Sequence, residues 1–495
     1  MGEIERIPTG VPGLDVLCGG GGLVRGAIYI VMGRPGTGKT TLANQLAFAH
    51  VERGGKVAYV TLLAESHSTM LANLRTMRFF KEEAVNRDIV YVGAYKSLRD
   101  DSLKGLLQLL RRIMRDQQAS MLFLDGVSPT RAFATSDSAL KEFIVELQLL
   151  SAMTRCTTVM LANTTTDETN GPEHTMVDGL IELAFERTNR RTLRTVELLK
   201  FRGSQHFLGR HEVTITVDGL TVYPRAEDVL DGHVSATHEA EASRTRVRSG
   251  IAHMDDMLGG GLLSGTMTVV LGYTGSGKTT LALQFLHAGA AQGEPVLYFG
   301  FYEPPARVLE AGESHGLDLK RLDREGLFEQ IWQPPYEHAL DPLADRLLTN
   351  VRKRGVRRVV IDGLDGFRLA SVEHDRTIRF ITAVSNELRA LDVTTLATQE
   401  THAPYGPEIT MRIEGTSAVT DAVLLLEYVT VGTELKRLFS VAKHRGSRQA
   451  TSVREFQLTD RGLEIAADSE SARAIFGTQS YPWSRRASRS LPPND

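Results

Sequence analysis

Short apolar runs alternate with helical patterns along both halves of the chain. In the first half the runs AIYIVM, KVAYVT, MLFLD and TTVMLAN are candidate strands, and TVVLG, PVLYFGF, RVVID and TTLATQ match them in the second half. Continuous apolar strands separated by helices are typical of a parallel sheet that is buried on both faces. The pattern predicts an α/β fold in two copies, each a mainly parallel sheet flanked by helices.

The two halves share one order of features, which indicates a duplication. The openings TGVPGLDVLCGGGG and SGIAHMDDMLGGG are each followed by an apolar strand, a glycine-rich loop and a helix. The loop lysines Lys39 and Lys278 are 239 residues apart, and Lys200 and Lys443 are 243 apart. A spacing this constant predicts two homologous domains.

Four segments follow from this repeat. Residues 1–225 and 247–466 are expected to form the two domains. Residues 226–246 are polar and lack a continuous apolar face, which predicts a linker. Residues 467–495 are rich in proline, serine and arginine, which predicts a mostly disordered tail.

Composition and charge exclude several classes of protein. The 495 residues include 42% hydrophobic and 24% charged side chains, with 57 basic against 60 acidic groups and a net charge of −3. This balance argues against a protein that coats DNA or an anionic membrane. Two cysteines, Cys18 and Cys156, do not support a disulfide framework or a cysteine-ligated zinc site. With no signal-type start and no spanning apolar run, a cytoplasmic location is expected.

The glycine-rich loops GRPGTGKT and GYTGSGKT both fit the pattern G-x-x-x-x-G-K-[ST] in full. Each follows a predicted strand and opens a predicted helix, which is the context that makes this motif a phosphate-binding loop. Its glycines allow backbone N–H groups to surround a phosphate, and its lysine reaches the β- and γ-phosphates. The candidate nucleotide contacts are Gly33, Gly36, Thr37, Gly38, Lys39, Thr40 and Thr41, and Gly272, Gly275, Ser276, Gly277, Lys278, Thr279 and Thr280.

A strand-end aspartate accompanies each loop at a matching distance. Asp125 ends MLFLD and Asp362 ends RVVID. Strands often end in aspartate for turn reasons alone, but beside a phosphate loop such a carboxylate predicts a Mg²⁺ site. Thr40 is expected to ligate the same ion as Asp125, and Thr279 the same ion as Asp362.

One glutamate lies near the end of the strand that follows each phosphate-loop helix. Glu65 lies 26 residues after Lys39, and Glu303 lies 25 after Lys278. These positions suit a carboxylate that orients or deprotonates the attacking water, although a solvated glutamate that opens a helix is the ordinary alternative. His67, two residues after Glu65, has no second ligand at metal spacing and is expected on a helix surface.

The two copies of Lys-x-Arg-Gly, in LLKFRGSQH and SVAKHRGSR, complete a set that resembles the RecA-like ATPases, specifically the double-domain KaiC family of circadian clock proteins. The resemblance implies a hexameric double ring with ATP bound between neighbouring subunits. It implies that the lysine and arginine of each copy reach the γ-phosphate of an ATP bound by the neighbouring subunit. It also implies that a histidine following the first copy contacts nucleotide. These residues are Lys200, Arg202, Lys443 and Arg445, with His206; the second half has Gln449 in place of the histidine. Side chains two apart on a strand point the same way, and the ordinary alternative is a charged sheet edge.

The chain departs from the KaiC family in two places. Where the family has adjacent glutamates, this chain has Ala64-Glu65 and Glu303-Pro304. The family's clock proteins carry a Ser-Thr acceptor pair, and here Ser417 is followed by alanine. Ser417 is therefore the candidate phosphoacceptor, and a cap or strand-start serine is the alternative. Thr416 and Thr420 are lesser candidates.

These features favour a ring-forming signalling ATPase that uses ATP and Mg²⁺ and carries serine autokinase activity in its second domain. Its expected partners are further copies of itself and unidentified regulatory proteins. A DNA-acting RecA-type motor is a second hypothesis, opposed by the short, mixed-charge segments GVSPTRAFATSDSALKEF and GLDGFRLASVEHDRTIRF, where basic loops would be needed. A scaffold that uses ATP only for assembly is a third.

Overall fold

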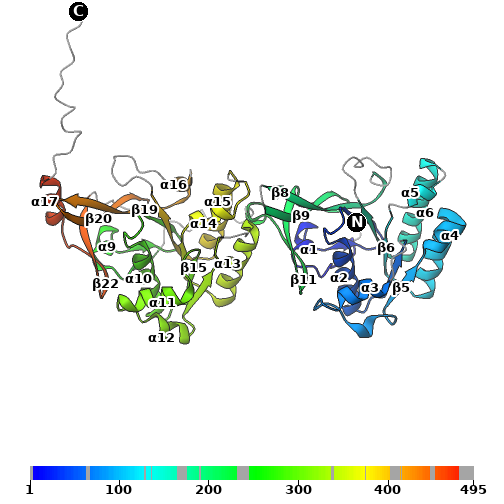
Figure 1. The fold of residues 1–495 in the computed structure, drawn as a ribbon, viewed down its shortest axis with the longest axis horizontal. Helices are drawn as coiled ribbons and strands as arrows, with labels where there is room; N and C mark the ends of the chain where they lie inside the picture. Colours follow the sequence, from blue (N-terminus) through cyan, green and yellow to red (C-terminus); the bar gives the residue numbers. More distant parts are fainter. Residues whose placement is uncertain are drawn as a thin grey trace, which may run out of the picture. The chain divides into compact units, whose positions relative to one another are not determined.

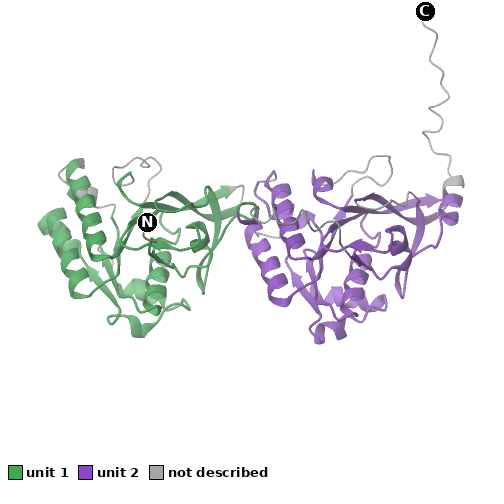
Figure 2. Ribbon diagram, turned by 180° about the vertical axis from the view of Figure 1, so that it is seen from behind, with its two compact units in different colours: residues 1–228 green, residues 229–495 purple. Residues whose placement is uncertain are grey.

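The computed structural model describes two compact units, Met1–Asp228 and Val229–Asp495, shown in different colours in Figure 2. The described residues are 4–62, 67–127, 130–134, 136–163, 175–188, 191–230, 245–335, 339–373, 375–401, 413, 415–445 and 452–478.

The first unit is built on a nine-stranded sheet (Figure 1). In spatial order its strands are β11 (Gly219–Tyr223), β10 (Arg210–Thr216), β9 (Arg191–Phe201), β8 (Gly179–Thr188), β3 (Ile28–Gly33), β7 (Thr157–Asn163), β6 (Met121–Asp125), β4 (Val57–Thr61) and β5 (Ile89–Gly93). Its helices are α1 (Leu14–Leu17), α2 (Lys39–Glu52), α3 (His67–Leu74), α4 (Tyr95–Asp116), α5 (Thr130–Phe133), α6 (Asp137–Thr154) and α8 (Ala226–Leu230). Neighbours from β8 to β5 pair in parallel, whereas β8 to β11 form antiparallel hairpins.

The second unit repeats this arrangement. Its sheet runs β16 (Phe328–Trp332), β15 (Val296–Gly300), β17 (Arg358–Asp362), β18 (Thr394–Glu400), β14 (Met267–Gly272), β19 (Ala422–Val431), β20 (Glu434–His444), β21 (Arg454–Thr459) and β22 (Gly462–Ile465). Its helices are α9 (Ala252–Met257), α10 (Lys278–Ala290), α11 (Pro305–Ser314), α12 (Leu319–Arg324), α13 (Leu340–Arg354), α14 (Asp365–Ala370), α15 (Arg376–Ala390), α16 (Thr416–Val419) and α17 (Glu470–Thr478). Two short pairs, β1 (Arg6–Ile7) with β2 (Leu23–Val24) and β12 (Arg246–Val247) with β13 (Leu262–Leu263), open the two units.

Strand β3 shows why these runs form a parallel sheet with helices on both faces. Tyr29 and Val31 belong to one hydrophobic core with α2, whereas Ile28, Ile30 and Met32 belong to a second core with α4 and α6. Side chains alternate between the faces of a strand, so a continuous apolar run must be covered twice. The predicted α/β fold in two copies, each mainly parallel and flanked by helices, is confirmed.

The predicted strands and the observed ones agree closely in the parallel part of each sheet. MLFLD, TTVMLAN and RVVID correspond to β6, β7 and β17 in full. The antiparallel hairpins were not predicted, because their alternating and partly exposed strands carry a weaker apolar pattern.

The predicted linker and the predicted tail each contain a short helix near their first residues. The first five residues of the predicted linker form α8, with Ala226 and Leu230 buried. The predicted disordered tail has to be corrected between 470 and 478, where α17 places Ala472 and Ile475 against Leu438. In both helices a few apolar side chains are buried, and their burial outweighs the polar composition around them. Residues 231–244 and 479–495 of these predictions lie outside the described residues.

Candidate functional site

Each phosphate loop connects the central strand of its sheet to a helix, β3 to α2 and β14 to α10. Gly38 and Gly277 directly precede the helices, with φ of 108° and 101°. A Cβ atom at Gly38 would lie 2.5 Å from Ile215 Cδ1. The backbone conformation therefore favours glycine here, and a Cβ at Gly38 would also force the Ile215 side chain to move. The free N–H groups of a helix N-terminus favour an anion at this position.

The loop lysines are held over their own loops. Lys39 Nζ donates to the carbonyl oxygens of Gly33 and Arg34, at 2.7 and 3.1 Å. Lys278 Nζ makes the two equivalent bonds in the second loop, at 2.9 and 2.7 Å. Burial lowers the pKa of Lys39, and the Asp125 carboxylate partly opposes that shift. The ammonium groups thus lie where phosphate oxygens are expected.

In the second unit Asp362 is bonded to a residue of the phosphate loop motif. Its Oδ2 accepts from the Thr279 hydroxyl at 3.1 Å and from the Tyr298 hydroxyl at 2.5 Å, and its Oδ1 accepts from Thr398. Burial, followed by the Asp362 charge, raises the pKa of Tyr298 well above its usual value. The tyrosine therefore remains a hydrogen-bond donor to this carboxylate.

The threonine and aspartate pair fits Mg²⁺ when a nucleotide is present. Among the residues that the structure describes, no group of three or more histidine, cysteine or carboxylate side chains could hold a metal by itself. Thr279 and Asp362 offer one hydroxyl and one carboxylate, and Mg²⁺ commonly combines such a pair with substrate phosphates and water. The chemistry of these two donors therefore fits Mg²⁺ beside a bound nucleotide.

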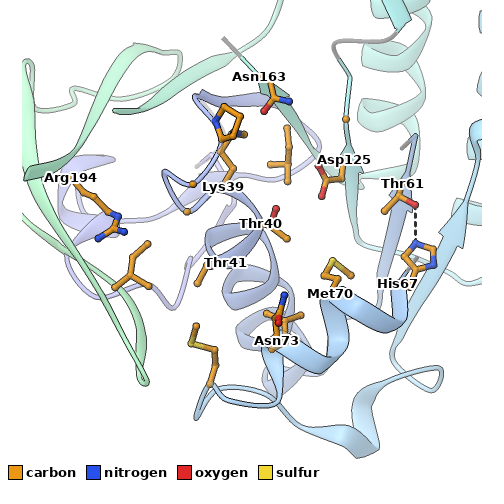
Figure 3. Close-up of a pocket in the computed structure, with 18 residues that line it drawn as sticks. Lys39, Thr40, Thr41, Thr61, His67, Met70, Asn73, Asp125, Asn163 and Arg194 are labelled. Atoms are coloured by element: carbon orange, nitrogen blue, oxygen red, sulfur yellow. Dashed lines mark hydrogen bonds between the residues drawn. The ribbon is translucent and has the colours of Figure 1, made fainter. Parts of the chain in front are cut away.

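A cavity of about 550 Å³ surrounds the first phosphate loop (Figure 3). Lys39, Thr40, Thr41 and Asp125, all predicted site residues, line it together. The other lining residues are Pro35, Gly36, Gly38, Thr61, His67, Met70, Asn73, Leu74, Met77, Gly126, Leu161, Asn163, Arg194 and Ile215. The fold thus collects the loop, the strand-end carboxylate and α3 around one space large enough for a small ligand.

His67 is a correction to the expectation of a surface helix residue. It lines the cavity at the start of α3, and its Nε2 lies 2.9 Å from Thr61 Oγ1, as Figure 3 shows. Burial lowers the pKa of His67, opposed by Asp125. The imidazole is on the inner side of α3 because Thr61 and Tyr91, on neighbouring strands, pack against it.

Of the two candidate catalytic glutamates, the structure describes Glu303. Glu65 lies outside the described residues. Glu303 is exposed, three residues after β15 and just before α11. It is close enough to Tyr298 for its charge to contribute to the raised tyrosine pKa. It thus emerges at the carboxyl edge of the sheet, the same edge as Asp362.

The Lys-x-Arg pairs lie away from their own phosphate loops. Lys200 pairs with Leu180, which pairs in turn with Ile30 of β3, three residues before Gly33. Three residues span about 10 Å along a strand, and two strand spacings add about 10 Å sideways. Lys443 has the equivalent place in the second unit. A lysine side chain is too short to bridge that separation.

A β-bulge next to each of these lysines changes the direction of its side chain. The register of β8 and β9 shifts so that Leu199 has no partner of its own, and Ala442 is the equivalent residue in β20. After the bulge Phe201, rather than Lys200, turns into the core, where its ring lies 5.5 Å from Tyr29. Bulges commonly redirect a side chain in this way.

The arginines lie beyond the strands, since β9 ends at Phe201 and β20 at His444. The argument from strand period therefore does not set their direction. Instead the Arg202 and Arg445 N–H groups donate to the carbonyls of Asp178 and Asp421, both at 2.8 Å. The lysines also contact main chain, with Lys200 Nζ 2.7 Å from the Thr175 carbonyl. Both arginines are exposed.

The histidine that follows the first pair packs against the strand end. The His206 ring lies 6.2 Å from Phe201, and its Nε2 is buried without a hydrogen-bond partner within the described part of the chain. Gln449, at the equivalent place in the second half, lies outside the described residues.

Ser417 lies on the one-turn helix α16, beside the second Lys-x-Arg pair. Lys443 Nζ donates to the carbonyls of Ser417 and of Thr420, the latter at 2.8 Å. The Ser417 side chain is exposed, whereas Thr416 and Thr420 are buried. Their hydroxyls donate to the Ile413 and Ser417 carbonyls at 2.8 and 3.4 Å. Of the three candidates, only Ser417 presents its side chain to solvent.

Two arginines near the loops were missed at the sequence level. Arg194 lines the cavity in the first unit, with its guanidinium 5.3 Å from the Phe185 ring centre. In the second unit Arg437 lies 5.4 Å over Tyr428, whose hydroxyl donates to the Gly275 carbonyl of the loop. The signal was present, since both arginines lie six residues before the repeated lysines.

The segments considered for DNA binding are largely helical where the structure describes them. In the second unit α14 buries Phe367 and Ala370, and α15 follows from Arg376. In the first unit α5 and α6 occupy the same place. Such packed helices differ from the mobile basic loops of a DNA motor. No helix among the described residues is long and apolar enough to cross a membrane.

Comparison with known proteins agrees with this geometry. A family model described as "ATPase: KaiC" matches residues 7–227 and again 247–470. The circadian clock oscillator protein KaiC of Thermostichus vulcanus is 27% identical over 475 residues, which covers 94% of this chain and 89% of that protein. KaiC of Prochlorococcus marinus strain MIT 9313 is 26% identical over 487 residues, covering 96% and 95%. KaiC 1 of Synechocystis strain PCC 6803 is 25% identical over 475 residues, covering 93% and 89%.

The duplicated sheet, the two phosphate loops and a family match that spans both units lead to one conclusion. The chain belongs to the KaiC family of ATPases.

Proposed function

We propose that this chain hydrolyses Mg²⁺-ATP at sites that are completed by a neighbouring copy of itself, in a ring of the KaiC type. Each domain contributes one phosphate loop and one strand-end carboxylate to a site. The six-membered ring is the assembly that the family resemblance implies. Regulatory partners of the ring remain unidentified.

One observation carries the proposal of shared sites. Lys200 and Lys443 lie about 10 Å back along the strand and two strands away from their own phosphate loops. A cation placed there cannot serve its own γ-phosphate, but it is available at the edge of the unit to a loop on another chain. Hydrolysis would then depend on assembly.

The proposed roles follow from each group's chemistry. The loop backbone and Lys39 or Lys278 hold the β- and γ-phosphates. Thr40 with Asp125, and Thr279 with Asp362, hold a Mg²⁺ ion, which would neutralise phosphate charge when bound. Glu65 and Glu303 orient the attacking water. The neighbour's Lys-x-Arg pair stabilises the charge that develops on the γ-phosphate.

Removing each loop lysine tests the sites separately. Lys39→Ala and Lys278→Ala should each weaken ATP binding about 100-fold in one domain only, because charge-assisted bonds to the phosphates are lost. Bound nucleotide per chain, measured after acid extraction, should fall by about half in each variant. The exposed Lys353→Ala on α13 is the matched control and should retain full nucleotide. Unchanged nucleotide content in both loop variants would contradict the site assignment.

We further propose Ser417 as the phosphoacceptor of the second domain. Its exposed side chain lies on α16, which is bonded through main-chain carbonyls to Lys443 and Arg445. If those cations approach a neighbour's γ-phosphate, the serine hydroxyl is carried to the same interface. The buried neighbours Thr416 and Thr420 are poorer acceptors, because their hydroxyls are committed to carbonyl groups.

Intact-mass measurement after incubation with Mg²⁺-ATP tests this assignment. The chain is expected to gain one phosphate, which peptide mapping places on Ser417. Ser417→Ala should abolish the gain, and Thr420→Val should not. A folded, ATP-loaded chain without any gain would end the kinase part of the proposal and leave the ATPase part standing.

A further inference from the structure

Each metal-binding aspartate is bonded to a buried tyrosine on the next strand. Tyr59 OH donates to Asp125 Oδ2 at 2.9 Å, and Tyr298 OH donates to Asp362 Oδ2 at 2.5 Å. The two tyrosines are 239 residues apart, as the loop lysines are. Their side chains are 0% and 2% exposed. The contact therefore occurs at equivalent positions in both domains.

Strand register explains how the hydroxyl meets the carboxylate. On β4 and β6, Thr61 pairs with Asp125, and Tyr59 pairs with Phe123 two residues earlier. Residues two apart share one face of a sheet, so the tyrosine ring lies on the aspartate's face and extends along it. On β15 and β17 the pairs Gly300 with Asp362, and Tyr298 with Val360, repeat this register.

Packing alone explains the ring but not its hydroxyl. The Tyr59 ring stacks 5.6 Å from Phe123 and lies 5.3 Å from Tyr91, contacts that phenylalanine would also make. A buried hydroxyl without a partner is destabilising, so its presence indicates a use for the bond. In the second unit that use is visible, because the same oxygen of Asp362 also accepts from Thr279, the loop threonine.

We propose that Tyr59 and Tyr298 are positioning residues for the magnesium site. By holding Oδ2, each tyrosine sets the rotation of the carboxylate that faces the loop threonine, so that the ion meets a pre-oriented ligand pair. Outer groups that orient metal ligands commonly change metal affinity by about 10–100-fold. This inference rests on the proposed Mg²⁺-ATP site.

The two domains differ in the residue that lies beside the aspartate on the next strand. In the second unit Thr398 donates to Asp362 Oδ1. The equivalent place in the first unit is Leu161, which pairs with Asp125 and cannot donate. This position on the neighbouring strand therefore supplies a hydroxyl to the carboxylate in the second domain only.

The test removes one hydroxyl and keeps the ring. Full-length Tyr59→Phe, measured in a Lys278→Ala background, reports the first domain, and Tyr298→Phe in a Lys39→Ala background reports the second. Mn²⁺ binding is measured by electron paramagnetic resonance in the presence of a non-hydrolysable ATP analogue. We expect Mn²⁺ affinity to fall about 10–100-fold for each variant. Binding of the analogue in EDTA should not change.

Two further variants keep the result decisive. Tyr29→Phe is the control, since its hydroxyl is also buried in the first unit but accepts from the Val24 N–H group. It should leave Mn²⁺ affinity unchanged. Leu161→Thr, added to Tyr59→Phe, restores a donor and should recover part of the lost affinity.

The outcomes separate this inference from the function on which it rests. Unchanged Mn²⁺ affinity in both Tyr59→Phe and Tyr298→Phe, or an equal loss in Tyr29→Phe, would overturn the positioning role. So would a loss of analogue binding in EDTA, which would make the tyrosines structural. If the parent chains bind no Mn²⁺ with the analogue, the proposed function itself fails.

Discussion

A chain in which both Lys-x-Arg pairs are replaced by alanine is expected to keep its nucleotide and to hydrolyse it about 10³-fold more slowly. Cations that reach the γ-phosphate from a neighbouring subunit typically contribute factors of about 10³–10⁵ to hydrolysis. The phosphate loops of such a chain are intact, so binding should survive. ADP release and bound nucleotide, measured on the same sample, distinguish the two effects.

Mixing two inactive chains tests whether these cations act between subunits. The partner carries Lys39→Ala and Lys278→Ala, and therefore has intact cations but defective loops. In a randomly mixed ring, about a quarter of the interfaces join an intact loop to intact cations. The mixture should therefore regain about a quarter of the wild-type rate.

Two controls accompany the mixture. Lys436→Ala, at the opposite end of β20 and paired with Glu434 at 2.9 Å, should hydrolyse ATP at the wild-type rate. A chain with defective loops and defective cations should restore nothing when mixed. If the complementary mixture also stays inactive, the cations do not act across an interface, and the shared-site model is wrong.

Replacing Glu303 and Glu65 together by glutamine should lower ADP release by about 10²–10³-fold while nucleotide stays bound. Glutamine keeps the size and hydrogen-bonding capacity of glutamate but cannot take a proton from the attacking water. The single variants, Glu65→Gln and Glu303→Gln, then show which domain contributes most of the turnover.

This experiment also separates an enzyme from a scaffold. The control Glu310→Gln changes an exposed glutamate of α11, seven residues after Glu303, and should have no effect. Wild-type chain that binds ATP without releasing ADP would favour the scaffold hypothesis. A double variant that turns over at the wild-type rate would remove both carboxylates from the mechanism.

Where a local pattern carried the information, sequence and structure agree. The parallel strands were predictable because burial on both faces requires an unbroken apolar run, as in β6 and β17. The phosphate loops were predictable because glycine positions and one lysine define them within eight residues. Strand-end aspartates such as Asp125 and Asp362 are weak signals by themselves. The duplication strengthened them, because each lies at a similar distance from the phosphate loop of its own half.

Contacts between distant segments were not predictable from local pattern. Arg194 reaches the first cavity because an antiparallel hairpin returns past the loop, and α17 is ordered because Leu438 lies nearby. His67 faces inward because Tyr91 on β5 packs against its ring. None of these partners is close in sequence.

The sequence by itself determined two α/β domains, their phosphate loops and the identities of the candidate site residues. Tertiary structure alone decided what they meet. Strand register brings Tyr298 to Asp362, a bulge turns Lys200 outward, and the strand order places Lys200 far from its own loop. The physical reason is that chemistry and local propensity belong to single residues and short runs. Proximity instead depends on how strands are ordered and registered, which the packing of the whole sheet determines.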